Sequence, residues 1–409
     1  MQSFKFSLLQ LSLLLVSPTL MGQRMSREQA VQTALQNNQM IKSAEFQVEY
    51  FRQVKKTGTD IGKLTAVWMH GQYNSVYQDN NLTLMQTLPF PTALGAQVRL
   101  GREQVTGSEK NLAATRNNLV FDVKSVYEQL LYQEAYRKLL MTQDSLYADF
   151  AKASSLRYKT GESNLLEKTT AETQLMEIKN LGRLNDADIR ISQTRLQALL
   201  KSDLPVMAGD ILVRQVPPEE MTSFQNNPQL DYLKQQVTIS NQFKKVERNR
   251  IMPDLLFGYF NQSLTGVQNI NGQDTFYPRS THFQGFELGL GIPLWFAPHV
   301  ARSRAAAFQE EASRKNAEYF ETTLNGAYTQ ALQEFDKNLA SLDYYETSAL
   351  INAELILTQA RKAYRTGEIG YIEYLQSLRS ALSIKSNYLI SLNQYNQSII
   401  KLEFLSGKF

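Results

Sequence analysis

The sequence predicts a mainly α-helical protein with a small transmembrane β part, built from a duplicated helical hairpin. Three observations support this fold class: two long tracts contain none of the 11 prolines, strand-like segments precede each tract, and short motifs recur in the same order in both halves. Apolar residues make up 43% of the 409 residues, which suffices for a large core and excludes a disordered chain.

Residues 1–22 are predicted to be a signal peptide. Lys5 precedes the apolar stretch Phe6–Leu20, and Gly22 supplies a small residue at a cleavage site. We expect the mature chain to begin near Gln23; the alternative is an uncleaved amphipathic start of a cytosolic protein. No later segment has an apolar run long enough for a spanning helix, so the protein is expected in the periplasm, in the outer membrane or outside the cell.

Four segments have strand-like patterns and form two pairs, each joined by polar sequence that contains asparagine and glycine. They are Leu64–Val76, Leu82–Leu88, Asp254–Leu264 and Phe283–Leu294. A helix that begins with a capping box of Ser26 and Gln29 is expected before the first pair. In the last segment every second residue is apolar, from Phe286 to Leu294, so one face of the strand is suited to lipid and the other to water.

The number of these strands predicts oligomerisation. The smallest membrane barrels have about eight strands, so four strands cannot close one, whereas three copies of the chain would supply about twelve. Trp68, Tyr259 and Trp295 are candidate aromatics at the membrane interface, and ordinary packing against a helix is the alternative for each of them.

Two proline-free tracts, Thr92–Leu204 and His299–Phe409, are predicted to be helical hairpins with coiled-coil packing. Apolar residues recur in both at steps of three and four residues. One glycine interrupts each tract, Gly161 in the first and Gly367 in the second, and glycine suits the position after a helix end. Arms of about 60 residues would reach roughly 90 Å.

Internal repetition divides the mature chain into a first structural repeat, 23–210, and a second, 211–409. Each repeat is expected to contain a helix, two strands, a long helix, a tip and a returning helix. The matching motifs, in chain order, are Gln36-Asn37-Asn38 with Gln225-Asn226-Asn227, Lys55-Lys56 with Lys244-Lys245, Leu88-Pro89 with Ile292-Pro293, and Tyr158-Lys159-Thr160-Gly161-Glu162 with Tyr364-Arg365-Thr366-Gly367-Glu368.

The composition excludes several functions. The 43 Lys and Arg residues nearly balance the 39 Asp and Glu residues, so no nucleic-acid partner is expected. The sequence has no cysteine, which excludes disulfides, thiolate metal sites and cysteine nucleophiles. Its three histidines leave little for a metal or catalytic site built from histidine. Because the sequence contains no phosphate-binding loop, nucleophile–base pair or metal cluster, we expect no enzyme, no cofactor and no resident metal.

The duplicated plan, the paired tips and the strand exits Leu88-Pro89-Phe90-Pro91 and Ile292-Pro293-Leu294 resemble the TolC-like outer-membrane efflux proteins over nearly the whole mature chain. The resemblance implies a homotrimer in the outer-membrane lipid, with a shared 12-stranded β-barrel made of four strands per protomer and an α-helical barrel tunnel that extends into the periplasm. It also implies a passive exit duct that works with an inner-membrane transporter, of the RND type or similar, and a periplasmic adaptor.

The same resemblance implies a gate at the hairpin tips. It places an acidic pore ring at Glu373, but the second acid of the family is Gln376 here. It pairs Tyr364 with Glu167 through a hydrogen bond between neighbouring coils, and the usual gate arginine is Ile369. The ring would attract cations and repel anions.

The tips have two compatible interpretations. Thr160, Gly161, Thr366 and Gly367 are expected to form plain turns and also to be where an adaptor docks. Three basic residues lie at the tips: Arg157, Lys159 and Arg365. They are expected either to form a basic collar there or to stabilise the C-termini of the helices with their positive charge.

Three alternatives remain open at this stage. The run Gln86–Thr92 is similar to strand exits in the heavy-metal branch of the family, which would make the protein a metal-cation duct, and residues in or beside the strands could relay a soft metal: Met69, His70, His282 and His299. A soluble periplasmic coiled-coil scaffold or adaptor is a second alternative, and an enzyme on a helical scaffold is the third.

Overall fold

The computed structural model describes residues 23–217 and 223–409, so the predicted signal peptide, 1–22, lies outside the described residues. The chain forms two compact units. The hairpin unit contains the described residues up to Asn38 together with Leu119–Val216 and Glu334–Ile400. The sheet unit contains Gln39–Asn118, the described part of 217–333, and Lys401–Phe409. Both units therefore take segments from both halves of the sequence.

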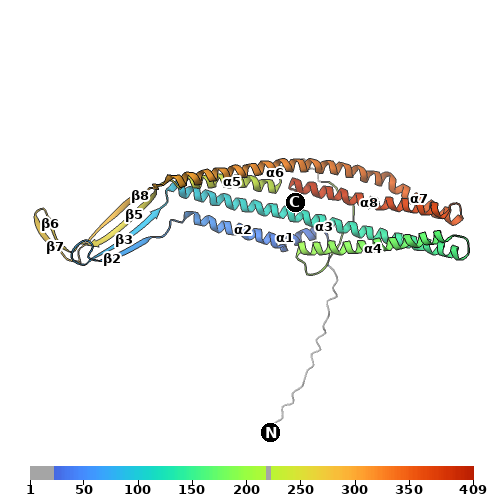
Figure 1. Ribbon diagram of the computed structural model, residues 1–409, viewed down its shortest axis with the longest axis horizontal. Helices are drawn as coiled ribbons and strands as arrows, with labels where there is room; N and C mark the ends of the chain where they lie inside the picture. Colours follow the sequence, from blue (N-terminus) through green and yellow to red (C-terminus); the bar gives the residue numbers. More distant parts are fainter. Residues whose placement is uncertain (1–22, 218–222) are drawn as a thin grey trace, which may run out of the picture. The chain divides into compact units, whose positions relative to one another are not determined.

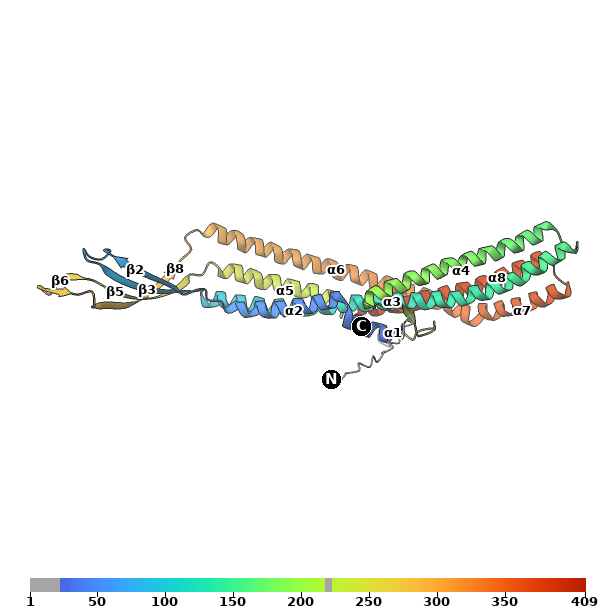
Figure 2. The same cartoon turned by 90° about the horizontal axis from the view of Figure 1, so that it is seen from below.

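In the hairpin unit, two helical hairpins end at glycine tips, as predicted. The C-terminal part of α3 (Pro91–Lys159) lies beside α4 (Leu165–Leu200), and α7 (Leu350–Thr366) lies beside α8 (Tyr371–Ser406) (Figure 2). Gly161 and Gly367 have φ values of +76° and +78°, a region that only glycine adopts without strain. The tip glycines therefore end α3 and α7 for the conformational reason that the sequence suggested.

The arms of the hairpins are unequal, in contrast to the expected arms of about 60 residues. The outgoing helix α3 has 69 residues, and the returning helix α4 has 36 because it stops at Lys201, which adopts a left-handed cap with φ 51°. In the second half, α6 (Phe296–Tyr344) continues through a π-helix (Tyr345–Ala349) into α7, and α8 returns with 36 residues.

The N-terminal part of the hairpin unit contains α1 (Arg27–Asn37), which begins with the predicted capping box. The Gln29 N–H donates to Ser26 Oγ, and Gln29 Oε1 accepts from the Ser26 N–H at 2.9 Å. A parallel pair of short strands that was not predicted, β1 (Gln23–Met25) and β4 (Val206–Ala208), fixes the start of α1 against the segment after α4.

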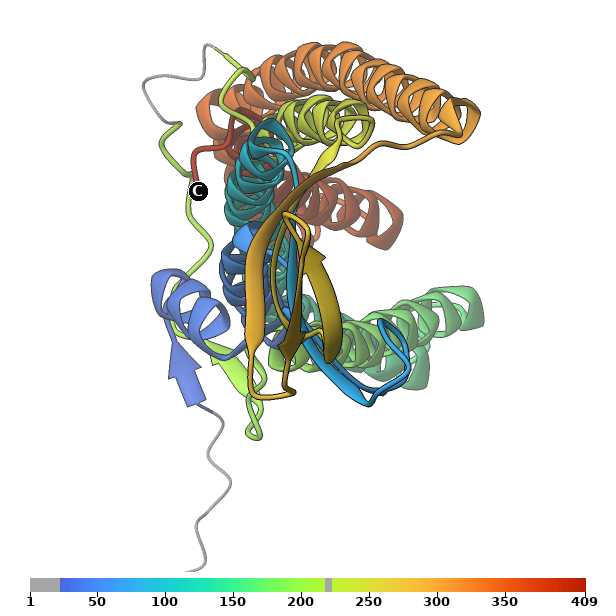
Figure 3. The same ribbon diagram turned by 90° about the vertical axis from the view of Figure 1, so that its left-hand side faces the viewer.

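The sheet unit contains one antiparallel sheet in the order β2-β3-β5-β8, which Figures 1 and 3 show from two directions. Its strands are β2 (Thr65–Gly71), β3 (Asp79–Leu88), β5 (Asp254–Ser263) and β8 (His282–Gly291). Both predicted strand pairs form, and β3 with β5 joins them. The last strand is shorter than predicted and ends before Pro293, which has no N–H for the sheet.

The loop between β5 and β8 contains a hairpin that was not predicted. It consists of β6 (Gly266–Ile270) and β7 (Gln273–Tyr277), joined by Asn271 and Gly272. Both turn residues have positive φ, 57° and 85°, as a two-residue type I′ turn requires.

The sheet presents one apolar face, because residues directly opposite each other in an antiparallel pair lie on the same side. Leu290 is opposite Leu255, Leu288 is opposite Phe257, and Phe286 is opposite Tyr259. On this face the exposed fractions of Phe286 and Leu288 are 84% and 78%. The intervening residues of β8 are Glu287 and glycines, so the predicted alternation is present in the folded strand.

Within the sheet unit, the helices pack against one another through small residues. α2 (Gln39–Lys56) and α5 (Pro228–Asn249) lie near the start of α3, and Ala96, Leu100 and Val246 form a buried cluster there. A Cβ atom at Gly107 of α3 would lie 2.6 Å from Ile239 Cδ1, so only glycine allows α5 to approach this closely. Among the described helices, none is long and apolar enough to cross a membrane.

Candidate functional site

The first site is a cluster of three side chains near the hairpin tips, Arg157, Glu167 and Tyr364, which we call the latch cluster. Glu167 lies in the first turn of α4, where its N–H donates to the N-cap side chain of Asn164 at 2.8 Å. Only 2% of Glu167 is exposed. The helix N-terminus favours a carboxylate at this position, because the first N–H groups of a helix carry partial positive charge.

Arg157 binds both of the other members of the latch cluster. Its Nη1 donates to Glu167 Oε1 at 3.1 Å and to Tyr364 Oη at 3.2 Å, while the Tyr364 hydroxyl donates to the same Oε1 at 3.4 Å. Burial raises the pKa of Tyr364, and the hydrogen bond to Tyr364 raises the pKa of the Arg157 guanidinium. The cluster therefore joins the first hairpin to the second through a charged, largely buried contact.

Aromatic packing holds Tyr364 in place. Its ring is stacked on that of Tyr374 with 4.5 Å between centroids and 11° between planes, and Phe150 contacts both rings. Phe150 and Tyr374 belong to the buried core of the two hairpins, together with Tyr147, Leu375 and neighbouring apolar residues, and the partly buried Tyr364 packs against this core. The position of the Tyr364 hydroxyl is thus set by packing rather than by the hydrogen bonds alone.

The structure brings Glu167 and Tyr364 together but leaves the other predicted gate residue apart. Glu373 is exposed in the first turn of α8, where its Oε2 accepts a hydrogen bond from the Gly370 N–H at 3.2 Å. The four predicted docking residues are all exposed at the tips: Thr160, Gly161, Thr366 and Gly367.

Sequence reasoning missed the role of Arg157, which was expected either in a basic collar at the tips or as a favourable charge at a helix C-terminus. One signal was available: the aligned tip motifs have arginine at 157 in the first repeat and alanine at 363 in the second. A charged residue confined to one of two matching tips indicates a contact made once per protomer. The partners, 10 and 207 residues away along the chain, are visible only in the folded protein.

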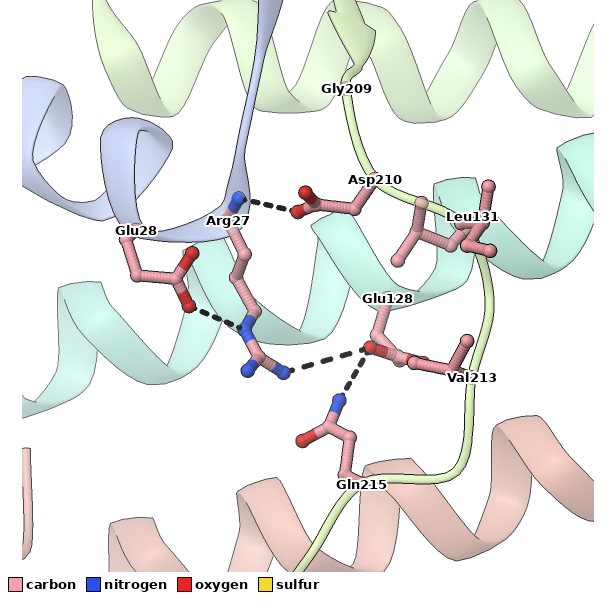
Figure 4. A pocket seen from close by; sticks show the side chains of 9 residues that line it. Arg27, Glu28, Glu128, Leu131, Gly209, Asp210, Val213 and Gln215 are labelled. Carbon is pink, nitrogen blue, oxygen red and sulfur yellow. Dashed lines mark hydrogen bonds and ion pairs between the residues drawn. The ribbon is translucent and has the colours of Figure 1, made fainter.

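A second site in the hairpin unit is an open cleft of about 460 Å³ (Figure 4). Its carboxylates already have partners: Asp210 Oδ2 accepts from the Arg27 N–H at 2.9 Å and from the Tyr127 hydroxyl at 2.8 Å. Glu128 accepts from Asn396 at 2.6 Å and from Gln215 at 2.7 Å. Burial raises the pKa of Glu128, while these two donors and Arg27 lower it. The cleft therefore links segments distant in sequence through hydrogen bonds to its two carboxylates.

The segment that follows β4 is also fixed by charge. Arg214 contacts Asp343 and Glu346, each at 2.8 Å, and its guanidinium lies over the ring of Tyr395 at 5.2 Å. Glu346 belongs to the π-helix, so this connector is attached to the point where α6 passes into α7.

The histidine of β2, His70, has polar neighbours. His70 Nδ1 lies 2.8 Å from Asn80 Oδ1, and Arg279 contacts both residues. Within residues 23–217 and 223–409, no three His, Asp or Glu side chains are grouped so that they could hold a metal ion. The heavy-metal alternative gains no support from the described part of the chain.

Comparisons with known proteins give a fold for the whole chain and a family match for its second half. The outer membrane efflux protein family matches residues 222–408. A search of curated protein sequences finds no match.

Solved structures resemble the chain over almost its whole length. The CmeC outer membrane channel of Campylobacter jejuni is 15% identical with a TM-score of 0.75, over 94% of this chain and 86% of that one. The VceC outer membrane protein of Vibrio cholerae is 13% identical with a TM-score of 0.75, over 93% and 96%. The MtrE outer membrane channel of Neisseria gonorrhoeae, in its open state, is 15% identical with a TM-score of 0.74, over 93% and 88%.

Identities this low establish the fold alone. The second half of the chain thus matches the outer membrane efflux protein family, and the chain as a whole has the fold of these channels.

Proposed function

We propose that the chain is the exit duct of a tripartite efflux or secretion system. In this proposal it acts as a homotrimer and passively conducts substrates that an inner-membrane pump and a periplasmic adaptor deliver to it. The sheet carries the proposal: within the described chain, the outer edges of β2 and β8 pair with no strand, and an apolar face is exposed. Unpaired edges together with an exposed apolar face are the features that further strands and lipid cover in a membrane barrel.

The soluble scaffold is disfavoured by the same face, because a water-soluble sheet would leave side chains such as Phe286 and Leu288 in contact with water. Three copies of the four-stranded sheet would close the edges with about twelve strands.

The two repeats, 23–210 and 211–409, are part of the proposal. In each, a helix (α2 or α5) precedes a pair of sheet strands, a long helix and a returning helix (α4 or α8). The repeats are consecutive segments of the sequence, whereas the hairpin and sheet units group residues that pack together in the folded chain.

The proposed gate has two parts. The latch cluster would hold the two hairpins of one protomer together, since it crosses between them. Glu373, being exposed near the tip of the second hairpin, would form an acidic ring with its two symmetry copies.

The trimer and its ring are tested together on purified mature protein. Native mass spectrometry in detergent is expected to give the mass of three chains, and planar bilayers are expected to show discrete cation-selective channels. Glu373→Gln is expected to keep the trimer and to lose most of the cation selectivity, because it removes three charges from the aperture. A monomer that is soluble without detergent would contradict the duct, and selectivity unchanged in Glu373→Gln would contradict the ring alone.

The exposed tips are proposed as the place where the adaptor docks. Replacing Thr366 and Gly367 and their immediate neighbours by a short Gly-Ser linker is expected to leave the trimer mass and conductance intact while abolishing export by cells. The matched control is the same replacement at Thr160 and Gly161, which separates a contact with one tip from a contact with both. Normal export by both variants would refute docking at the tips.

A further inference from the structure

A cleft between α5 and α6 lies in the sheet unit, next to the strands, and has no part in the proposed gate. The two helices run side by side, as Figure 1 shows, and are held together by Ser240 with Ser313 and by Asn241 with Glu310. Ser240 Oγ lies 2.9 Å from Ser313 Oγ, and Asn241 Nδ2 donates to Glu310 Oε1 at 2.6 Å. Nearer to the strands, the helices enclose a cleft of about 380 Å³.

The cleft combines two positive charges, one negative charge and an apolar wall. Arg250 and Arg302 are exposed guanidiniums on its rim, and Phe243 with Ala305 and Ala306 supply the apolar surface. Arg250 Nε lies 3.4 Å from Glu247 Oε1, whereas Arg302 has no acidic partner among the described residues. An acceptor with at least two oxygen atoms, such as a phosphate diester, complements two guanidiniums.

Glu247 is the unusual member of the cleft. It is only 6% exposed, and its Oε2 has no hydrogen-bond partner within the described chain. A buried carboxylate oxygen without a donor costs free energy, so the site is incomplete until a donor approaches it. The ligand that completes the cleft therefore carries a hydrogen-bond donor, preferably cationic, in addition to its phosphate.

The position of the cleft specifies where such a ligand comes from. The strands with the apolar face end at Gly291, and exposed apolar residues continue through Leu294 and Trp295 to the start of α6 at Phe296. Arg302 follows six residues after Phe296, about 9 Å along the helix axis. Headgroups occupy the layer just beyond the hydrocarbon, and arginine side chains extend toward that layer.

We propose that this cleft binds the headgroup of a phosphatidylethanolamine molecule from the periplasm-facing leaflet of the outer membrane. Its phosphate lies between Arg250 and Arg302, its ammonium group donates to Glu247, and its acyl chains lie along the apolar surface. The proposal rests on the outer-membrane location and adds a specific lipid site to the duct.

The test compares two zwitterionic lipids that differ in one respect. Phosphatidylcholine has the same phosphate and the same net charge as phosphatidylethanolamine, but its quaternary ammonium has no N–H to donate. Native mass spectrometry of the full-length trimer, incubated with each lipid in turn, is expected to retain phosphatidylethanolamine about tenfold better. Equal retention of the two lipids by the wild-type protein would overturn the assignment to Glu247.

Two arginine variants test the phosphate position. Arg302→Gln is expected to lower retention of both lipids about tenfold, because a charge-assisted hydrogen bond to the phosphate is lost. The matched control is Arg304→Gln on the same helix, which removes an exposed charge outside the cleft and should change retention less than twofold. Equal effects of the two variants would reduce the site to general surface charge and refute it.

Glu247→Gln is expected to abolish the preference between the two lipids while leaving phosphatidylcholine retention unchanged. Should this variant fail to assemble, the comparison of the two lipids on the wild-type trimer decides the same question. Trimer mass and conductance are measured on the same preparations. An absence of trimers would refute the proposed duct, whereas trimers that conduct ions but show no lipid preference would refute the lipid site alone.

Discussion

Replacing Leu288 by lysine is expected to prevent most of the protein from assembling in the outer membrane. Leu288 lies on the apolar face of the sheet, opposite Phe257, and is 78% exposed in the single chain. A lysine facing lipid near the bilayer midplane costs about 2 to 4 kcal/mol, and a trimer carries the substitution three times. The measurement is the yield of trimer extracted from outer membranes with detergent.

Glu287→Lys provides the control for this prediction. Glu287 is the neighbouring residue of β8 and lies on the opposite face, where it pairs with Gly258. A lysine there would face the water-filled interior, so trimer yield should remain near that of the wild type. If Leu288→Lys assembled normally and Glu287→Lys did not, the face that we assign to lipid would be the interior one.

Replacing Arg157 by glutamine is expected to open the proposed gate. The change leaves the Glu167 carboxylate buried without its cationic partner. A hydrogen bond to a charged group contributes about 1.5 to 3 kcal/mol, and partial exposure of Arg157 puts the loss near the lower end. A loss of about 2 kcal/mol shifts the balance between closed and open states roughly 30-fold. The measurement is the open probability of single channels in planar bilayers.

The remaining members of the cluster give a graded series. Tyr364→Phe removes one hydroxyl and keeps the stacked ring, so a smaller increase in open probability is expected, about two- to tenfold. Arg365→Gln serves as the control, because Arg365 is an exposed charge at the tip of the second hairpin. An unchanged open probability in both Arg157→Gln and Tyr364→Phe would show that the latch cluster stabilises the fold without gating the channel.

The sequence predicted those parts of the fold that local chemistry determines. The two helical tracts followed from where proline is missing, the tips from Gly161 and Gly367, and β8 from its alternation of apolar residues with glycine and Glu287. Each of these signals acts within a few residues, so it can be recognised without knowledge of the tertiary contacts.

Other features were missed for identifiable reasons. The hairpin of β6 and β7 had a local signal, the Asn271-Gly272 pair, which is typical of a type I′ turn. The end of α4 had none, since Lys201 adopts a left-handed conformation that is unusual for lysine. The resemblance suggested the pairing of Tyr364 with Glu167, but the contact of Arg157 with Tyr364 depends on packing between hairpins about 200 residues apart, which periodicity alone does not specify.

The π-helix between α6 and α7 affects residues well beyond its own five positions. A π-turn holds one residue more than an α-turn, and each residue of an α-helix rotates the next by about 100°. All side chains from Leu350 to Thr366 are therefore turned by that angle relative to an uninterrupted helix. Tyr364 faces Glu167 in this phase, so the length of the chain at 345–349 determines whether the hydroxyl of Tyr364 can reach Glu167.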